Sequence, residues 1–239
     1  MPTLLAFDTS GPYCAAALVK SEGGALRLAA ARGEVMTKCQ AERIFPMIEE
    51  MLAEAGASWS GLDAIACGVG PGNFTGVRVG VSAARGLALS LGVPAFGVTA
   101  FDMVRAEAGG GRHALVSLPA PKGRAMVQPF DGARPSGEAR LIDPDTPPRD
   151  LQAATDMTVV GHDADRIARH FEARASRPSV DPLALQDDEG LPDGYPAWRI
   201  ATIAMERLLR GDAPDRPVPL YVRAPDAAPP KAVPPPVVP

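Results

Sequence analysis

The chain has 239 residues, of which 46% are hydrophobic, and a formal net charge of −4 at pH 7. This length and apolar content allow a large buried core, either as one two-lobed unit or as two small domains. The acidic balance argues against a protein that binds nucleic acid unaided, because such a surface is normally basic.

The sequence also disfavours membrane and secreted classes. Arg78 and Arg85 interrupt the longest apolar stretch, which leaves no run of about 18 uncharged apolar residues for a membrane span. The first residues, Met1-Pro2-Thr3, lack the basic region of a secretory signal. The three cysteines are widely spaced without a Cys-x-x-Cys, which predicts free thiols in a reducing cytoplasm rather than a disulfide framework.

The first hundred residues predict three strands followed by alternating helices and strands. Apolar residues alternate with a period near two at first, and then recur with a period near 3.6. In chain order, the predicted elements are strands at 3–7, 14–19 and 25–31, a helix at 41–56, a strand at 64–67, a helix at 77–92 and a strand at 94–98. An antiparallel meander feeding βαβ units predicts an α/β fold with a mixed sheet and helices packed on it.

A glycine-rich turn joins the strand at 64–67 to the helix at 77–92, and it reads Gly70-Pro71-Gly72-Asn73-Phe74-Thr75-Gly76. Glycines there allow positive φ and close approach of a ligand or of another backbone, and the amides that open the helix can bind an anion. A P-loop is disfavoured because no Gly-Lys-Ser/Thr follows. Two interpretations stay open: a ligand-binding loop, or a tight turn that packs helix on sheet.

Asp8-Thr9-Ser10 closes the first predicted strand. In folds with this order of elements, a carboxylate at that strand end can hold a metal–phosphate complex. Metal chemistry based on histidine is disfavoured, because the three histidines form no His-x-x-x-His pair. A serine nucleophile is disfavoured as well, since no Gly-x-Ser-x-Gly occurs.

The rest of the chain predicts a second, smaller α/β lobe. Its predicted elements are strands at 114–118, 125–130 and 158–161, a surface helix at 163–172, and loops at 143–150 and 178–196. An amphipathic helix at 197–210 follows and ends at Gly211. The predicted organisation is therefore a first lobe at 1–108, a second lobe at 109–196, a C-terminal helix and following segment at 197–223, and a Pro-rich, disordered tail at 224–239.

Four motifs together resemble the TsaB family. They are Asp8-Thr9-Ser10, the stretch from Gly70 to Arg78, the helix sequence Glu42-Arg43-Ile44-Phe45-Pro46-Met47, and Pro219-Leu220-Tyr221-Val222-Arg223. The resemblance is dense over residues 1 to about 105, thin from about 110 to 195, and returns at the last helix and the final motif. It implies the actin-like ATPase (RNase H-like) superfold with two small lobes.

The chain departs from the family pattern in two places. Gln40 stands near the position where the family often carries a histidine, and residues 118–124 replace the usual Asp-Ala-Arg stretch. Both departures weaken the case for a retained small-molecule site. The resemblance accordingly implies no tightly bound cofactor, at most weak binding of ATP, and only vestigial nucleotide-binding candidates. These candidates are Asp8, Thr9, Ser10, Gly70, Gly72 and Thr75.

The resemblance also implies a function without catalysis by this chain. TsaB proteins support formation of N6-threonylcarbamoyladenosine in tRNA, at the adenosine 3′ of the anticodon, while the catalytic relative TsaD holds the metal and transfers the threonylcarbamoyl group from its adenylate. The metal-binding His-x-x-x-His of TsaD corresponds here to residues 99–104, which contain no histidine. We expect this cytoplasmic chain to pair with TsaD, to join TsaE in a larger complex, and to meet tRNA only there. The alternative is an active ATPase or phosphotransferase of the same superfold, which uses Asp8 and the 70–76 loop.

The helices at 41–56 and 77–92 carry the predicted partner surface. From the residues alone, their apolar side chains are ordinary core. The resemblance instead implies that these two helices pair with TsaD, and that they form a homodimer when TsaD is absent. The partner-facing candidates are Ile44, Met47, Ile48, Met51, Val81 and Arg85.

Overall fold

A computed structural model of the chain describes residues 1–108, 111–152, 154, 156–178, 181–185, 193–214 and 216–222. The predicted tail at 224–239, Arg223, and much of the predicted loop at 178–196 lie outside the described residues. Within the described part of the chain, no helix is long and apolar enough to cross a membrane.

The first sheet has five strands in the order β3-β2-β1-β4-β5. They are β1 (Thr3–Asp8), β2 (Tyr13–Glu22), β3 (Ala25–Val35), β4 (Ala64–Gly68) and β5 (Ala95–Val98). The β1–β2 and β2–β3 pairs are antiparallel, whereas the β1–β4 and β4–β5 pairs are parallel. The predicted mixed sheet is therefore confirmed, and the carboxyl ends of β1, β4 and β5 meet at one edge of it.

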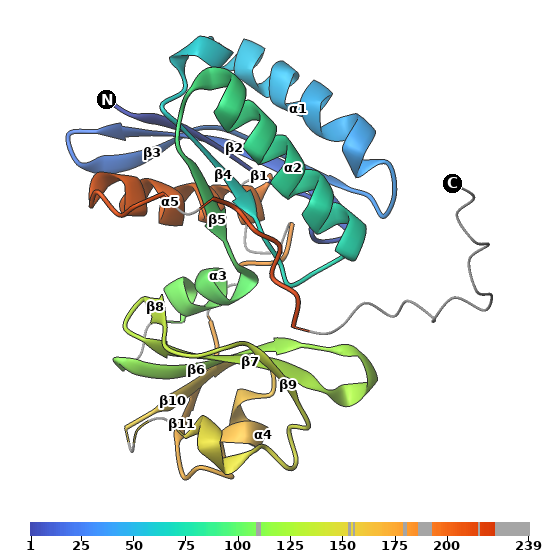
Figure 1. The fold of residues 1–239 in the computed structure, drawn as a ribbon, viewed down its shortest axis with the longest axis vertical. Helices are drawn as coiled ribbons and strands as arrows, with labels where there is room; N and C mark the ends of the chain where they lie inside the picture. The colour runs from blue at the N-terminus through green and yellow to red at the C-terminus, as the bar shows by residue number, and fades with distance from the viewer. Residues whose placement is uncertain are drawn as a thin grey trace, which may run out of the picture.

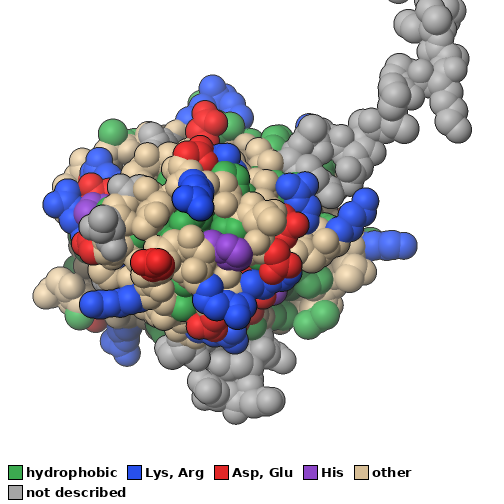
Figure 2. Space-filling view, turned by 90° about the horizontal axis from the view of Figure 1, so that it is seen from below, with side chains coloured by type: hydrophobic (Ala, Val, Ile, Leu, Met, Phe, Trp, Pro, Cys, Tyr) green, Lys and Arg blue, Asp and Glu red, His purple; other side chains and the backbone are tan. Residues whose placement is uncertain are grey.

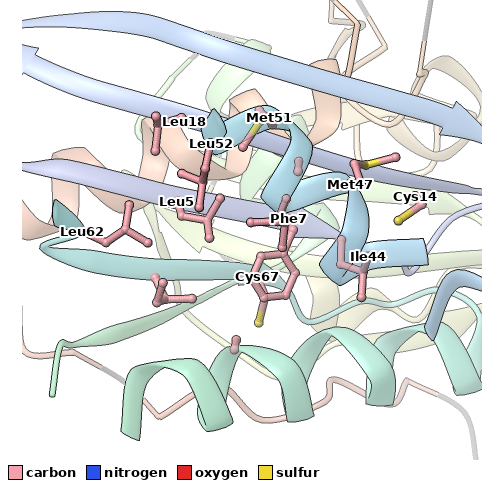
Figure 3. Packing of buried hydrophobic residues seen from close by; sticks show 14 of the residues in the cluster. Leu5, Phe7, Cys14, Leu18, Ile44, Met47, Met51, Leu52, Leu62 and Cys67 are labelled. Atoms are coloured by element: carbon pink, nitrogen blue, oxygen red, sulfur yellow. The ribbon is translucent and has the colours of Figure 1, made fainter. Parts of the chain in front are cut away.

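Helices cover both faces of this sheet (Figure 1): α1 (Gln40–Glu54) and α2 (Phe74–Leu91) lie on one face and α5 (Tyr195–Leu209) on the other. Alternation along β1 separates the two layers, because successive side chains of a strand point to opposite faces. Leu5 and Phe7 pack beneath α1 and α2 (Figure 3), while Leu4 and Ala6 pack with α5. The C-terminal helix thus contributes to the core of the N-terminal sheet.

The second sheet has the order β11-β10-β6-β7-β8, with β9 also paired to β7. Its strands are β6 (His113–Pro119), β7 (Ala125–Asp131), β8 (Arg134–Pro135), β9 (Arg140–Ile142), β10 (Thr158–Gly161) and β11 (Arg174–Ser176). Alternate side chains of β6 again divide two cores: Leu115 packs with α4 (Ala164–Ala168), and Val116 packs with α3 (Ala100–Glu107). Helix α3 lies between the two sheets (Figure 1).

Two helices differ from the sequence predictions. The predicted surface helix at 163–172 is wrong in extent: α4 begins after Asp163, which has a φ of 53°, and ends at Ala168. Helix α3 was not predicted, although its capping box, in which the Thr99 and Asp102 side chains each bond the other's backbone amide, was visible as Thr-x-x-Asp. A capping box before a short apolar run is a usable start signal for a helix of only eight residues.

Candidate functional site

Asp8 lies at the end of β1 with only 2% of its surface exposed. Its Oδ1 accepts a hydrogen bond from the Ser10 amide (2.8 Å), and its Oδ2 accepts from the hydroxyls of Ser10 (3.1 Å) and Tyr13 (3.0 Å). Burial raises the pKa of Asp8, and the three hydrogen bonds oppose that shift. Burial, together with the Asp8 charge, raises the pKa of Tyr13 well above its ordinary value. The Tyr13 hydroxyl therefore stays a donor.

The glycine-rich turn is packed against the segment that follows β1. A Cβ added at Gly72 would lie 2.5 Å from the carbonyl oxygen of Ser10, and one added at Gly76 would come closer than 3.0 Å to the carbonyl oxygen of Thr9. Gly70 has a positive φ of 91°, which favours glycine at that position, whereas the φ of Gly72 is not positive. Close backbone approach is thus the main demand on the glycines at 72 and 76.

The structure brings together four of the six nucleotide-binding candidates. Asp8, Ser10, Gly70 and Gly72 line a cavity of about 250 Å³ at the carboxyl edge of the first sheet, and the rest of its lining is Gly11, Pro12, Tyr13, Gly68, Pro71, Val98, Ala100, Met103 and Leu183. Thr9 is buried beneath the cavity, where its hydroxyl donates to the Gly76 carbonyl (2.7 Å). Thr75 is exposed in the first turn of α2 and does not line the cavity.

Tyr13 is the residue of this cavity that the sequence analysis missed. It is the first residue of β2 and is 4% exposed. A tyrosine at the start of a strand is common, and nothing in its neighbours points to Asp8. Only the path of the Ser10–Pro12 turn brings its hydroxyl to the carboxylate.

The C-terminal motif docks on the first turn of α2. The Leu220 amide donates to the Val69 carbonyl (2.8 Å). The Arg78 Nε–H donates to the Tyr221 hydroxyl (2.9 Å), and the Arg78 guanidinium lies 3.8 Å from the centre of the Phe74 ring. Two motifs far apart in the sequence therefore meet at one place, and this contact holds the C-terminal segment against the N-terminal sheet.

The placement of the partner-facing candidates needs correction. Four of them are on α1 and point into the core beneath it, with at most 1% of their surface exposed: Ile44, Met47, Ile48 and Met51. They pack with Leu5, Phe7 and other residues of the sheet (Figure 3). Val81 of α2 is 3% exposed and belongs to the same cluster, whereas Arg85 is half-buried on α2. The prediction that Met47, Ile48, Met51 and Val81 form a partner surface is wrong, because they cover the sheet. Ile44 is buried in the same core, although it also contributes to the groove described next.

The outer sides of α1 and α2 carry a different apolar surface, which we call the helix groove. The groove has a volume of about 460 Å³ and is lined by Ala41, Ile44, Phe45, Val79, Ser82, Ala83, Gly86, Leu87 and Ser90. Phe45 of α1 is 40% exposed, and Leu89 of α2 is 86% exposed. Except for Ile44, none of the groove residues was among the predicted partner-facing residues.

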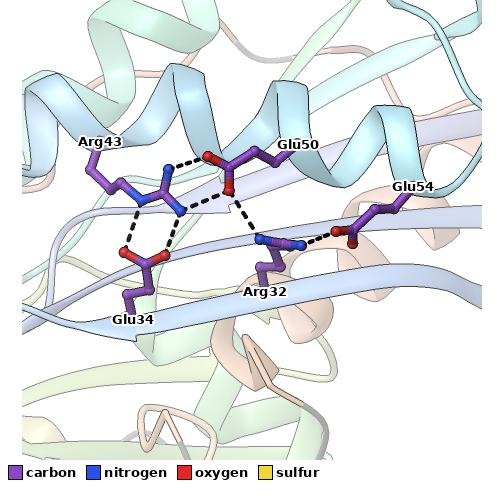
Figure 4. A network of polar contacts seen from close by, with 5 residues as sticks. All are labelled: Arg32, Glu34, Arg43, Glu50 and Glu54. Carbon is purple, nitrogen blue, oxygen red and sulfur yellow. Dashed lines mark hydrogen bonds and ion pairs between the residues drawn. The ribbon is translucent and has the colours of Figure 1, made fainter.

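A network of charges fixes the other side of α1 to β3 (Figure 4). Arg43 contacts Glu34 (2.8 Å from Nε) and Glu50 (2.8 Å from Nη1), and Arg32 contacts Glu50 (3.0 Å) and Glu54. Hydrogen bonds from Arg43 lower the pKa of the Glu34 and Glu50 carboxyls. Each of these exposed ion pairs adds little stability. Together they hold one side of α1 against β3, so the side that carries the helix groove faces away from β3.

Metal-binding side chains do not cluster in the part of the chain that the structure describes: no group of three or more His, Cys, Asp or Glu is close enough to hold an ion. In residues 99–104, the carboxylate of Asp102 caps α3 and forms an ion pair with Arg207 (3.0 Å). His113 contacts Asp156 (2.8 Å), and His162 contacts Asp163 (3.6 Å), which also pairs with Arg166 (3.4 Å).

The two departures from the family pattern have local structural roles. Gln40 opens α1, and its side-chain amide donates to the Met36 carbonyl (3.2 Å). It also lines a surface hollow with Ser10 and Asn73. Residues 118–124 comprise the end of β6 and the turn to β7, where Lys122 has a φ of 61°.

The buried Asp8 carboxyl predicts a pH-dependent stability difference between the native chain and Asp8→Asn. The folded-state pKa is raised above the ordinary 3.8, so the folded state binds the proton more tightly than the unfolded state. Its contribution is full below pH about 3.8 and is lost as pH rises through the folded pKa. We therefore expect the stability of native protein, relative to Asp8→Asn, to fall as pH rises from about 4.

Urea denaturation of both proteins between pH 4 and 8 measures this difference, and all other titrating groups are common to the two. Asn retains an acceptor for the Ser10 amide, so the packing around position 8 is preserved. A stability difference that is constant with pH, or one that favours the native protein increasingly at high pH, would contradict the raised pKa.

The sequence is similar to that of several known proteins. A family model described as "TsaD: tRNA N6-adenosine threonylcarbamoyltransferase" matches residues 33–119. The tRNA threonylcarbamoyladenosine biosynthesis protein TsaB of Haemophilus influenzae is 39% identical over 113 residues, which are 44% of this chain and 46% of that protein. An uncharacterized protein of Mycobacterium tuberculosis is 31% identical over 228 residues, covering 95% of this chain and 94% of the relative.

A solved structure extends the likeness over both lobes. YeaZ from Pseudomonas aeruginosa is 27% identical, with a TM-score of 0.61, and the match covers 92% of this chain and 100% of that one. YeaZ is TsaB under another name. The likeness to YeaZ in both sheets indicates an α/β fold of the actin-like, RNase H-like kind. By its sequence and its fold, the chain belongs to the TsaB family.

Proposed function

We propose that this chain is a non-catalytic subunit for the formation of N6-threonylcarbamoyladenosine in tRNA, and that it pairs with TsaD through the outer sides of α1 and α2. The observation that carries the proposal is the helix groove. Membership of the TsaB family supplies the pathway, and the groove supplies a surface on which a partner can act.

The composition of the groove suits a helix from another protein. Its lining is apolar except for Ser82 and Ser90, and Phe45 within it is 40% exposed. Ala83 and Gly86 are small residues that allow another backbone to come close. A contiguous apolar patch of this kind on a soluble lobe is typical of a protein-interaction site.

The sequence match to the TsaD family model favours TsaD as the partner. The matched residues, 33–119, contain α1, β4, α2, β5 and α3, so TsaD carries a related module. Two related modules can pair with the same helices facing each other about an approximate two-fold axis. Two copies of this chain can use the same surface, which supports a homodimer in the absence of TsaD.

The remaining parts of the proposal follow from this pairing. TsaD performs the transfer, TsaE joins the complex in the cytoplasm, and tRNA is bound by the complex.

Figure 2 shows acidic and basic side chains interspersed on the end of the second lobe. Several charged side chains of the second lobe are paired: Arg166 with Asp145, Arg140 with Asp150, and Arg177 with Asp165. Such a mixed surface is unlike the basic patch of a protein that binds nucleic acid unaided.

The alternative function, an ATPase that uses Asp8, needs a carboxylate oxygen free for a metal or for a water. The chain's own donors instead occupy both oxygens of Asp8. We therefore prefer the non-catalytic role.

Ala83→Glu tests the pairing surface. It places a charge in the helix groove at a partly buried residue on the edge of the core beneath the helices, and thermal unfolding checks that the fold is retained. Desolvating an unpaired charge costs several kcal/mol, or a factor of about 100 or more in Kd. The measurements are co-purification with TsaD and reconstituted tRNA modification with TsaD, TsaE and tRNA, in which this chain alone gives no transfer.

Leu209→Glu is the matched control, since Leu209 is 49% exposed at the end of α5 on the opposite side of the first sheet. It should bind TsaD as the native chain does. Equal binding of TsaD by Ala83→Glu and native chain would reject the groove as the pairing surface. Transfer by this chain without TsaD would reject the non-catalytic role.

A further inference from the structure

We infer that the ring of Tyr13 closes the cavity at the end of β1, so that the native chain excludes a metal-bound nucleotide phosphate there, and that removing the ring exposes Asp8 as a site for one. The actin-like fold implies such a ligand at this strand end, and the residues present do not fit it. The inference concerns this cavity alone and does not depend on the partner surface.

The position of the Tyr13 ring is fixed from three sides. Its hydroxyl donates to Asp8 Oδ2 (3.0 Å), which ties the end of the side chain to the strand end. Its ring edge lies over Gly11, where an added Cβ would come closer than 3.0 Å to ring carbons. The ring also belongs to a buried cluster with Leu185 and Ala197. A side chain held at both its ring and its hydroxyl is not free to swing aside.

The carboxylate of Asp8 accepts three hydrogen bonds from the chain itself. Ser10 supplies one donor to each oxygen, and Tyr13 supplies a second donor to Oδ2. The backbone of Gly68 closes the remaining side, because an added Cβ there would come closer than 3.0 Å to Asp8 Oδ1. A magnesium ion needs a carboxylate oxygen that points into open space and has room for several waters. Tyr13 occupies the position from which such an ion would approach.

The space that remains is smaller than the usual pocket for a cofactor. The cavity measures about 250 Å³, whereas pockets for drug-sized ligands and cofactors span about 300–1,000 Å³. Removing the phenol ring adds the volume of the ring to the cavity, next to the carboxylate. It also removes the donor to Oδ2, which leaves that oxygen available to a metal ion.

The chain retains other features of an anion site around this position. At Gly70 and Gly72 the turn presents backbone without a side chain to the cavity, and Pro71 between them also contributes to the lining. Asn73 caps α2 by accepting a hydrogen bond from the Gly76 amide (3.0 Å), and the following helix is 18 residues long. One substitution, at Tyr13, therefore separates the closed cavity from an accessible one.

The test is isothermal titration calorimetry with Mg-ATP on the full chain, in four forms: native, Tyr13→Ala, Tyr13→Phe, and Tyr13→Ala combined with Asp8→Asn. We expect no binding by the native chain at millimolar nucleotide. Tyr13→Ala should bind Mg-ATP with a Kd at least about tenfold lower than the millimolar concentration at which the native chain shows no binding. The reason is that a larger fraction of the variant has an accessible cavity. Tyr13→Phe keeps the ring and should behave as the native chain, and the double variant should lose the gained binding.

Each arm can overturn the inference. Mg-ATP binding by the native chain equal to that of Tyr13→Ala shows that Tyr13 does not close the cavity. Absence of binding by a folded Tyr13→Ala shows that no latent site exists, and full binding by Tyr13→Phe removes the role of the ring. Binding retained in the double variant removes Asp8 as the ligand. If Tyr13→Ala does not fold by circular dichroism, Tyr13→Val, which keeps a strand-forming side chain, takes its place.

Discussion

Ile48→Asp is expected to abolish the stable fold of this chain. Ile48 has no exposed surface and lies between α1 and the first sheet. A lone carboxylate there loses apolar packing and has no partner, at a cost of about 3–5 kcal/mol. This is a large part of the total stability of about 5–15 kcal/mol that is common for a folded protein. Met51→Asp, one turn further along α1, should have the same effect.

Phe45→Asp is the matched control for Ile48→Asp. It introduces the same residue into the same helix, but at a side chain that is 40% exposed in the helix groove. Thermal unfolding followed by circular dichroism should show little change for Phe45→Asp and a lost or strongly lowered transition for Ile48→Asp. Retention of the native melting temperature by Ile48→Asp would mean that α1 does not pack on the sheet as described.

The order of elements in the first lobe was predictable because its signals are local. Alternation near the N-terminus, a change of period at α1, and the glycine-rich turn before α2 each arise within about ten residues. All seven predicted elements of this lobe are present, with ends shifted by a few residues. The short strands β8, β9 and β11 were not predicted, because two or three residues carry no period.

Which side of a helix faces the sheet was harder to predict. Helix α1 carries one apolar stripe through Ile44, Ile48 and Met51 and a second one that includes Ala41 and Phe45. Periodicity finds both stripes but does not say which of them covers the sheet. Here the larger aliphatic stripe fills the space above β1 and β2, and the charge network with β3 fixes that rotation (Figure 4).

The candidate cavity shows the same limit of sequence reasoning. Asp8 and the glycines at 70 and 72 were grouped as nucleotide-binding candidates by the resemblance to the TsaB family. The contact that decides their chemistry comes from Tyr13, through a turn whose path is not encoded by periodicity. Pairwise contacts across a turn depend on tertiary packing, so the sequence indicated candidate residues but not the hydrogen bond from Tyr13 to Asp8.

Gly76→Ala is expected to be strongly destabilising, although alanine is the better helix former. Gly76 lies in the first turn of α2, against the backbone that follows β1. An added Cβ would overlap the Thr9 carbonyl oxygen, and the Thr9 hydroxyl already donates to the Gly76 carbonyl (2.7 Å). The backbone cannot rotate away as a side chain can. Relief requires α2 to move from the sheet, so the cost should reach or exceed the upper end of the usual overpacking range of about 1–3 kcal/mol.

Gly86→Ala, on the same helix, is expected to change the stability in the opposite direction. Nothing lies within 4 Å of a Cβ added at Gly86, which is exposed in the C-terminal half of α2. Replacing a helical glycine at such a position stabilises by about 0.5–1 kcal/mol. Urea denaturation of the two variants should therefore move the midpoint in opposite directions. If both variants gained stability, α2 would not be seated on the Thr9 backbone, and the glycine at 76 would have no structural requirement.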